Sequence, residues 1–132
     1  MITLDIYKDR RPIEGLVVAM LDVTFEKRGL KLIDAKSRAL AKYEIHELMI
    51  TDEVEAEPGR VVNRVSALAF FEIERGGLAV VGDKMILGEE TLGHLAGFDL
   101  THMPNHMNIL VKSESLKHPS IRVGDRLRIC RL

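Results

Sequence analysis

Hydrophobic and polar residues alternate over most of the chain, and this period of two predicts β-strands with one buried face. In the clearest run, residues 13–25, every odd position is apolar or glycine. Its even positions change from apolar at Leu16, Val18 and Met20 to polar at Asp22 and Thr24. Further strands are expected over residues 2–6, 30–33, 44–50, 61–74, 78–81, 84–87, 107–112 and 126–132.

Turn signals separate several of these strands. Residues 26–29 and the pair Gly82-Asp83 are typical of hairpin loops, and Glu57-Pro58-Gly59 predicts a tight turn. One short helix is expected from Ala35 to Tyr43, capped by Asp34. Residues 89–96 fit either a helix or a strand.

This series of short strands predicts a mainly β fold. A small closed or partly closed antiparallel barrel with one or two short helices is favoured, because closure removes unpaired strand edges. A two-sheet sandwich is the alternative. The length of 132 residues suits one domain over residues 1–132.

Composition narrows the classes of partner. The net charge is −1, whereas a general nucleic-acid binder usually carries a clear positive excess, so a nucleic-acid partner is not expected. No apolar run has the length of about 18–20 residues that a membrane span needs, so a membrane partner is not expected either. The single cysteine, Cys130, excludes an intrachain disulfide. A cytoplasmic location is therefore expected.

Residues 93–108, GHLAGFDLTHMPNHMN, carry the side chains best suited to chemistry. Three of the five histidines lie here, His94, His102 and His106. Pro104 interrupts the spacing between the last two, so they are not expected to form a helical zinc pair. The segment instead predicts a loop that enters the strand beginning at Met107, and loops on a rigid frame often carry functional sites.

Two functional interpretations fit this segment. In the first, His94, His102 and His106 bind a divalent transition metal with an open position for water. Asp99 is an alternative third ligand. In the second, no metal is involved, and His102 or His106 acts as a general base that the other histidine or Asp99 orients.

In either interpretation, neighbouring polar side chains would bind a small polar ligand; these are Thr101, Asn105 and Asn108. The structural alternative is that the same residues only satisfy backbone groups of a loop. No known metal-binding signature is present, since the segment has neither a cysteine pair nor His-Glu-x-x-His.

Arginines form a second feature near the C-terminus. Arg126 and Arg128 alternate with apolar residues and share one strand face. Surfaces that bind single strands usually add stacking aromatic residues, and none lies near Arg126. A solvated or ion-paired face is the simpler expectation.

The run over residues 13–25 also bears on assembly, because its first half is apolar on both faces. One core cannot cover both faces of every strand in so small a domain, so either the helix expected over residues 35–43 or a second subunit covers one of them. The sequence thus predicts a homo-oligomer. It favours a protein that binds a small polar molecule through residues 94–108, with hydrolysis, isomerisation or proton transfer as the candidate reactions. A non-catalytic oligomerising or regulatory module is the alternative.

Overall fold

The computed structural model describes residues 9–132, and every regular element in that range is a β-strand. The strands are β1 (Ile13–Phe25), β2 (Leu30–Lys31), β3 (Ser37–Leu40), β4 (Ile45–Thr51), β5 (Val61–Val62), β6 (Val65–Arg75), β7 (Gly77–Val80), β8 (Lys84–Leu87), β9 (Glu90–Asp99), β10 (Asn108–Lys112) and β11 (Arg126–Cys130). The prediction of a mainly β fold is therefore confirmed. The described residues include no helix that could cross a membrane.

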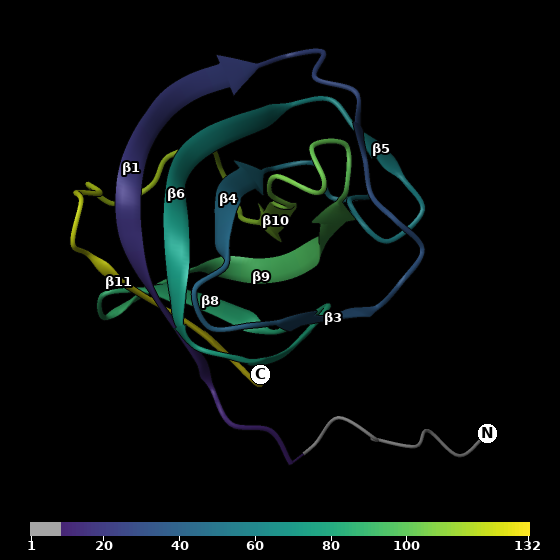
Figure 1. Ribbon diagram of the computed structural model, residues 1–132. Helices are drawn as coiled ribbons and strands as arrows, with labels where there is room; N and C mark the ends of the chain where they lie inside the picture. Colours follow the sequence, from purple (N-terminus) through teal and green to yellow (C-terminus); the bar gives the residue numbers. More distant parts are fainter. Residues whose placement is uncertain (1–8) are drawn as a thin grey trace.

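Seven strands form one sheet that closes on itself, which we call the ring (Figure 1). Its order is β1-β11-β8-β9-β10-β4-β6, and β6 pairs with β1 again. Every pairing is antiparallel except that of β10 with β4, which is parallel. The expectation of an antiparallel sheet is wrong at this one pairing. A parallel pair requires a long connection, and here β4 and β10 lie far apart in the sequence.

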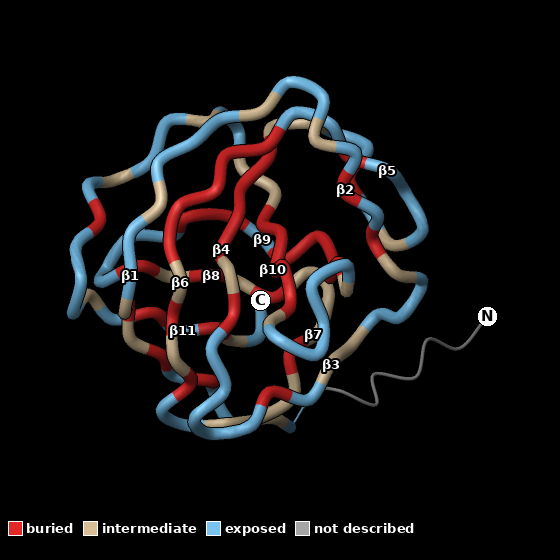
Figure 2. The backbone as a smooth tube through the Cα atoms, turned by 45° about the horizontal axis from the view of Figure 1, so that its top comes forward, coloured by how far each residue is buried: buried red, intermediate tan, exposed pale blue. Residues whose placement is uncertain are grey.

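Side chains that alternate along the ring strands form two apolar clusters on opposite faces of the sheet. The larger cluster fills the inside of the ring and includes Val17, Leu48, Phe71, Phe98 and Ile109. The smaller cluster lies on the outer face and includes Leu30, Met49, Val62, Ala67 and Leu110. Leu30 and Val62 come from the small β2–β5 sheet, which lies beside the ring (Figure 2).

The predicted helix from Ala35 to Tyr43 is wrong. Residues Ser37–Leu40 form β3, which pairs with β7. A helix of about two turns is marginal without tertiary support, whereas the exposed backbone of β7 offers β3 a row of hydrogen-bonding partners. Leu40 is buried in the inner cluster in this arrangement. The open choice at residues 89–96 is resolved as a strand, because they belong to β9.

Both predicted hairpins are also wrong, although strands flank each turn. β2 pairs with β5 and not with β1, and β7 pairs with β3 and not with β8. At the second turn the carboxylate of Asp83 accepts hydrogen bonds from the Val80 N–H at 2.9 Å and from the Arg10 guanidinium at 2.7 and 2.8 Å. The predicted turn at Glu57-Pro58-Gly59 is confirmed, with Gly59 at a φ of +85°.

Three expectations stay predictions. The strand expected over residues 2–6 lies outside the described residues. One domain over residues 1–132 and a cytoplasmic location rest on the sequence alone.

Candidate functional site

A row of polar side chains crosses the outer face of the ring. Glu47 of β4 lies opposite Asn108 of β10, and Asn108 lies opposite Asp99 of β9. Glu47 and Asn108 share the face of Met49 and Leu110, two members of the outer cluster. Phe70 of β6 lies next to the row, opposite Glu47. The register of β9, β10 and β4 thus assembles a polar row beside an apolar cluster.

Asp99 fixes one end of this row. Asp99 as a whole residue is only 1% exposed. One carboxylate oxygen accepts the Lys31 N–H at 2.8 Å, and the other accepts the Thr101 N–H at 2.9 Å and the Asn108 amide at 3.3 Å. Burial opposes ionisation, but these hydrogen bonds outweigh it and lower the pKa of Asp99 below its ordinary value. Asp99 therefore orients Asn108, and no hydrogen bond joins its carboxylate to a histidine among the described residues.

Asn108 is fully buried, and only one end of its side-chain amide is hydrogen-bonded. Its Nδ2 donates to Asp99, whereas its Oδ1 has no hydrogen-bond partner within residues 9–132. The two ends of an amide point away from each other, and Asp99 lies on the β9 side of β10. Glu47 is the register partner of Asn108 on the other neighbouring strand, β4, so the unpaired oxygen belongs to the same part of the row as Glu47. A buried acceptor without a partner is costly, typically about 1–3 kcal/mol.

The loop between β9 and β10 brings His106 onto the row. Its Nδ1 lies 2.7 Å from Asn105 Oδ1, its Nε2 lies 3.3 Å from Glu47 Oε1, and its ring packs edge-on against Phe70. An amide oxygen only accepts hydrogen bonds, so the neutral imidazole carries its proton on Nδ1. Nε2 then presents a lone pair toward the Glu47 carboxylate, and it has no hydrogen-bond partner among the described residues.

We call Glu47, His106 and Asn108 the acceptor cluster. Each contributes an acceptor atom (Glu47 Oε1, His106 Nε2 and Asn108 Oδ1), and the donors of His106 and Asn108 are directed to Asn105 and Asp99 instead. The side chains of His106 and Glu47 are only 14% and 13% exposed. A cluster of this kind is suited to a species that supplies protons or positive charge.

His102 lies at the edge of the acceptor cluster. Its ring stacks on His106 with centroids 5.0 Å apart, and its Nε2 is 3.4 Å from an Arg28 guanidinium nitrogen. The residue is exposed. His102 is thus placed to contact a molecule that reaches His106 from solvent.

His46 holds the end of the loop where it enters β10. The sequence analysis did not identify this residue. Its Nδ1 accepts the Met107 N–H at 3.1 Å, and its Nε2 lies 3.1 Å from Glu44 Oε1. Burial lowers the pKa of His46 below its ordinary value, and the nearby Glu44 opposes this only in part. A neutral His46 therefore serves as a structural anchor for the start of β10.

The structure brings most of the predicted site residues together, but not His94. Asp99, Thr101, His102, Asn105, His106 and Asn108 lie on or beside the row. His94 stands five residues from Asp99 along β9, about 16 Å away. It lies opposite Lys84 and Lys112 and lines a separate hollow.

The predicted metal centre of His94, His102 and His106 is therefore not formed. Within residues 9–132, no three His, Cys, Asp or Glu side chains gather as a metal-binding group. The two lysines beside His94 would also repel a cation.

Glu47 was missed because it comes from a strand remote in sequence from the histidine segment. The available signal was a carboxylate in the middle of a strand whose residues Leu48, Met49 and Ile50 are all apolar. Such a residue is rarely buried without a partner. Only the parallel pairing of β4 with β10 reveals that Glu47 lies opposite Asn108 and close to His106.

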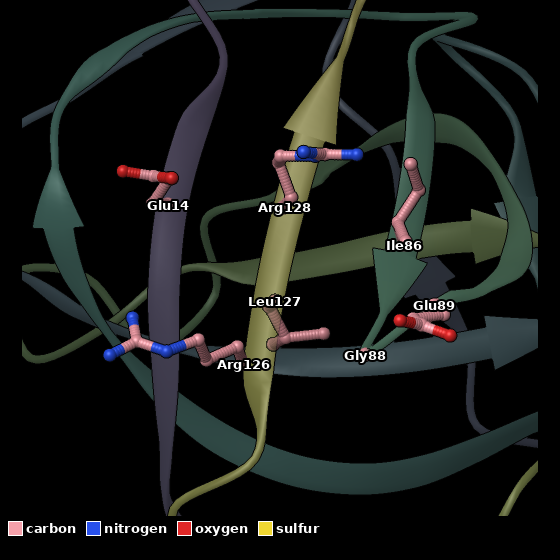
Figure 3. A pocket seen from close by; sticks show the side chains of 7 residues that line it. All are labelled: Glu14, Ile86, Gly88, Glu89, Arg126, Leu127 and Arg128. Atoms are coloured by element: carbon pink, nitrogen blue, oxygen red, sulfur yellow. The ribbon is translucent and has the colours of Figure 1, made fainter.

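A second hollow, of about 420 Å³, lies over β1, β11 and β8 (Figure 3). Arg126 reaches across β1 and Arg128 is directed toward Ile86, while Glu14 and Glu89 line the same hollow. Arg126 pairs with Glu74 at 3.0 Å. The two arginines and two glutamates that line it nearly balance in charge, so this hollow favours no one class of ligand over solvent.

Comparison with known proteins gives a family but no activity. Residues 7–129 match the model of a family of unknown function (DUF6917), and the chain belongs to that family. No curated protein and no solved structure matches the chain.

Proposed function

We propose that this member of the DUF6917 family is a small barrel protein that binds a small polar molecule on the outer face of its ring, at the acceptor cluster. The observation that carries the proposal is the pair of unpartnered buried atoms, His106 Nε2 and Asn108 Oδ1, beside Glu47. A ligand with N–H or O–H groups would satisfy both atoms. His102 and Arg28 would contact the part of the ligand that remains near solvent.

The same arrangement suits proton transfer. Nε2 of His106 would accept a proton from the ligand, and the resulting imidazolium would be stabilised by Glu47 at 3.3 Å. Asn105 fixes the tautomer by accepting from Nδ1. Hydrolysis and isomerisation both need such a step, so His106 is the residue we assign to it, with Glu47 as the residue that stabilises its charge.

A thermal-unfolding screen in the presence of a chelator tests this proposal. The probes are primary amines, amidines, amino acids, amides and polyols, each present in large excess. A compound at 100 times its Kd stabilises the folded state by about 2.7 kcal/mol. We expect at least one class to raise the Tm of the wild type and to leave that of His106→Ala unchanged.

His118→Ala is the matched control, because His118 is exposed and bonds only the backbone of its own loop. This variant should respond as the wild type does. If every stabilising compound acts equally on His106→Ala, or if no class stabilises the wild type, the ligand-binding proposal is wrong.

A second candidate function, a non-catalytic oligomerising module, is favoured by one feature of β1. Met20 and Val23 each remain 42% exposed on a strand of the ring, a cost that a second copy of the chain would remove. We expect light scattering at 100 μM to report a dimer or larger assembly, and Met20→Glu combined with Val23→Glu to return a monomer. A wild type that is monomeric at that concentration would contradict this candidate.

A further inference from the structure

We infer that the acceptor cluster holds a divalent transition-metal ion between Glu47 Oε1, His106 Nε2 and Asn108 Oδ1. The inference rests on the proposed function and names what satisfies the three acceptors. It replaces the trio of histidines expected from the sequence with a set of one nitrogen and two oxygen donors. Such a set suits Zn²⁺ and Mn²⁺.

The separation of the first two donors fits a shared ion. Nitrogen and oxygen ligands lie about 2.0–2.2 Å from Zn²⁺. Two ligands at those distances are about 3.0–3.5 Å apart in tetrahedral or octahedral geometry. His106 Nε2 and Glu47 Oε1 are 3.3 Å apart and do not form a hydrogen bond. The contact therefore has the distance of two ligands on one metal.

Each neutral donor is also held from behind by a second hydrogen bond. Asn105 accepts from Nδ1 of His106, which leaves Nε2 as the free donor atom. Asp99 accepts from Nδ2 of Asn108, and Asp99 itself is fixed by two backbone N–H groups. Hydrogen bonds of this kind orient metal ligands in proteins.

Charge points the same way. Glu47 makes no ion pair with a lysine or arginine among the described residues, and its 3.3 Å contact with His106 Nε2 is not a hydrogen bond. The guanidinium of Arg28 contacts His102 at the edge of the cluster. A divalent ion would neutralise the carboxylate and satisfy both orphan atoms at once. Three protein donors would leave at least one position for water or for a small polar molecule.

Titration of chelator-stripped protein with Zn²⁺ or Mn²⁺ alone, followed by calorimetry, tests the inference. We expect one ion per chain for at least one of the two metals. Glu47→Gln keeps the shape of the side chain and should weaken binding at least about 100-fold, as should His106→Ala. Asn105→Ala changes only the exposed second hydrogen bond, and we expect it to weaken binding about 10-fold without changing the stoichiometry.

His94→Ala is the matched control, since His94 lies on the same strand as Asp99 but in another hollow. It should bind within about twofold of the wild type, because a residue with no contact to the ion contributes little. Circular dichroism of each variant separates lost binding from lost folding, and Asn105→Ala provides a variant that leaves the buried row intact.

The metal inference is overturned if neither ion binds the wild type, or if Glu47→Gln and His106→Ala bind as the wild type does. In either case the screen in chelator decides separately on the proposed function. Stabilisation by a small molecule that depends on His106 would leave that function standing without the metal. Loss of both responses would remove both proposals.

Discussion

Replacement of Gly93 by alanine is expected to lower the free energy of unfolding by at least about 3 kcal/mol. A Cβ at this position would overlap the carbonyl oxygen of Lys112 and lie 2.8 Å from a methyl group of Val111. Both neighbours belong to β10, and the carbonyl is part of the backbone that pairs with β9. The strands can make room only by separating, which breaks the ring between β9 and β10 at the end of this pairing that lies away from the polar row.

Thermal or denaturant unfolding measures this effect, and a fall in Tm of about 10 °C or more is expected. Gly88→Asn is the matched control. Gly88 has a φ of +62° with nothing near its absent side chain, and asparagine tolerates that conformation. The control should cost about 1 kcal/mol or less. Equal losses at both positions would show that the close approach of β9 to β10 does not limit stability.

Asp99→Ala is expected to cost about 3–5 kcal/mol at neutral pH, because three donors lose their acceptor inside the protein. Two of these donors are backbone N–H groups of segments that frame the acceptor cluster. Asp22→Ala is the control, since Asp22 is exposed on β1, and it should change stability by less than about 0.5 kcal/mol.

The cost of Asp99→Ala should also depend on pH. The folded pKa of Asp99 lies below its ordinary value of 3.8, so its stabilising contribution is fully present above that value. The contribution is lost as the pH falls through the lower folded pKa. We therefore expect the difference in stability between wild type and variant to be constant from pH 7 to 5 and to shrink below pH 4. A difference that grows on acidification would contradict the assignment of Asp99 as a buried carboxylate.

The strands were readable from the sequence because alternation reports a local property, namely which face of each residue is buried. Ile45–Thr51 and Asn108–Lys112 were placed within about a residue for this reason. Strand pairing could not be predicted, because it depends on which strands from distant parts of the sequence offer an unpaired edge. Residues 26–29 and Gly82-Asp83 carry hairpin chemistry, yet the strands beside them found other partners.

The candidate site also has a part that the sequence predicts and a part that depends on strand pairing. His102, Asn105 and His106 share one loop, so their proximity followed from the sequence. Glu47 comes to them only through the parallel pairing of β4 with β10. His94 was grouped with the other histidines because a helix or a loop would have folded it back. The extended conformation of β9 carries it away instead.

The parallel pairing of β4 with β10 has a consequence for the order of events in folding. Glu47 and Asn108 are about 60 residues apart in the chain, and contacts between such distant segments are entropically costly and form slowly. The neighbouring pairs β8–β9 and β9–β10 can assemble without them. A chain arrested at that stage would have Asn108 beside Asp99 but no carboxylate opposite it. Binding competence would then be acquired in the last kinetic phase, when the ring closes.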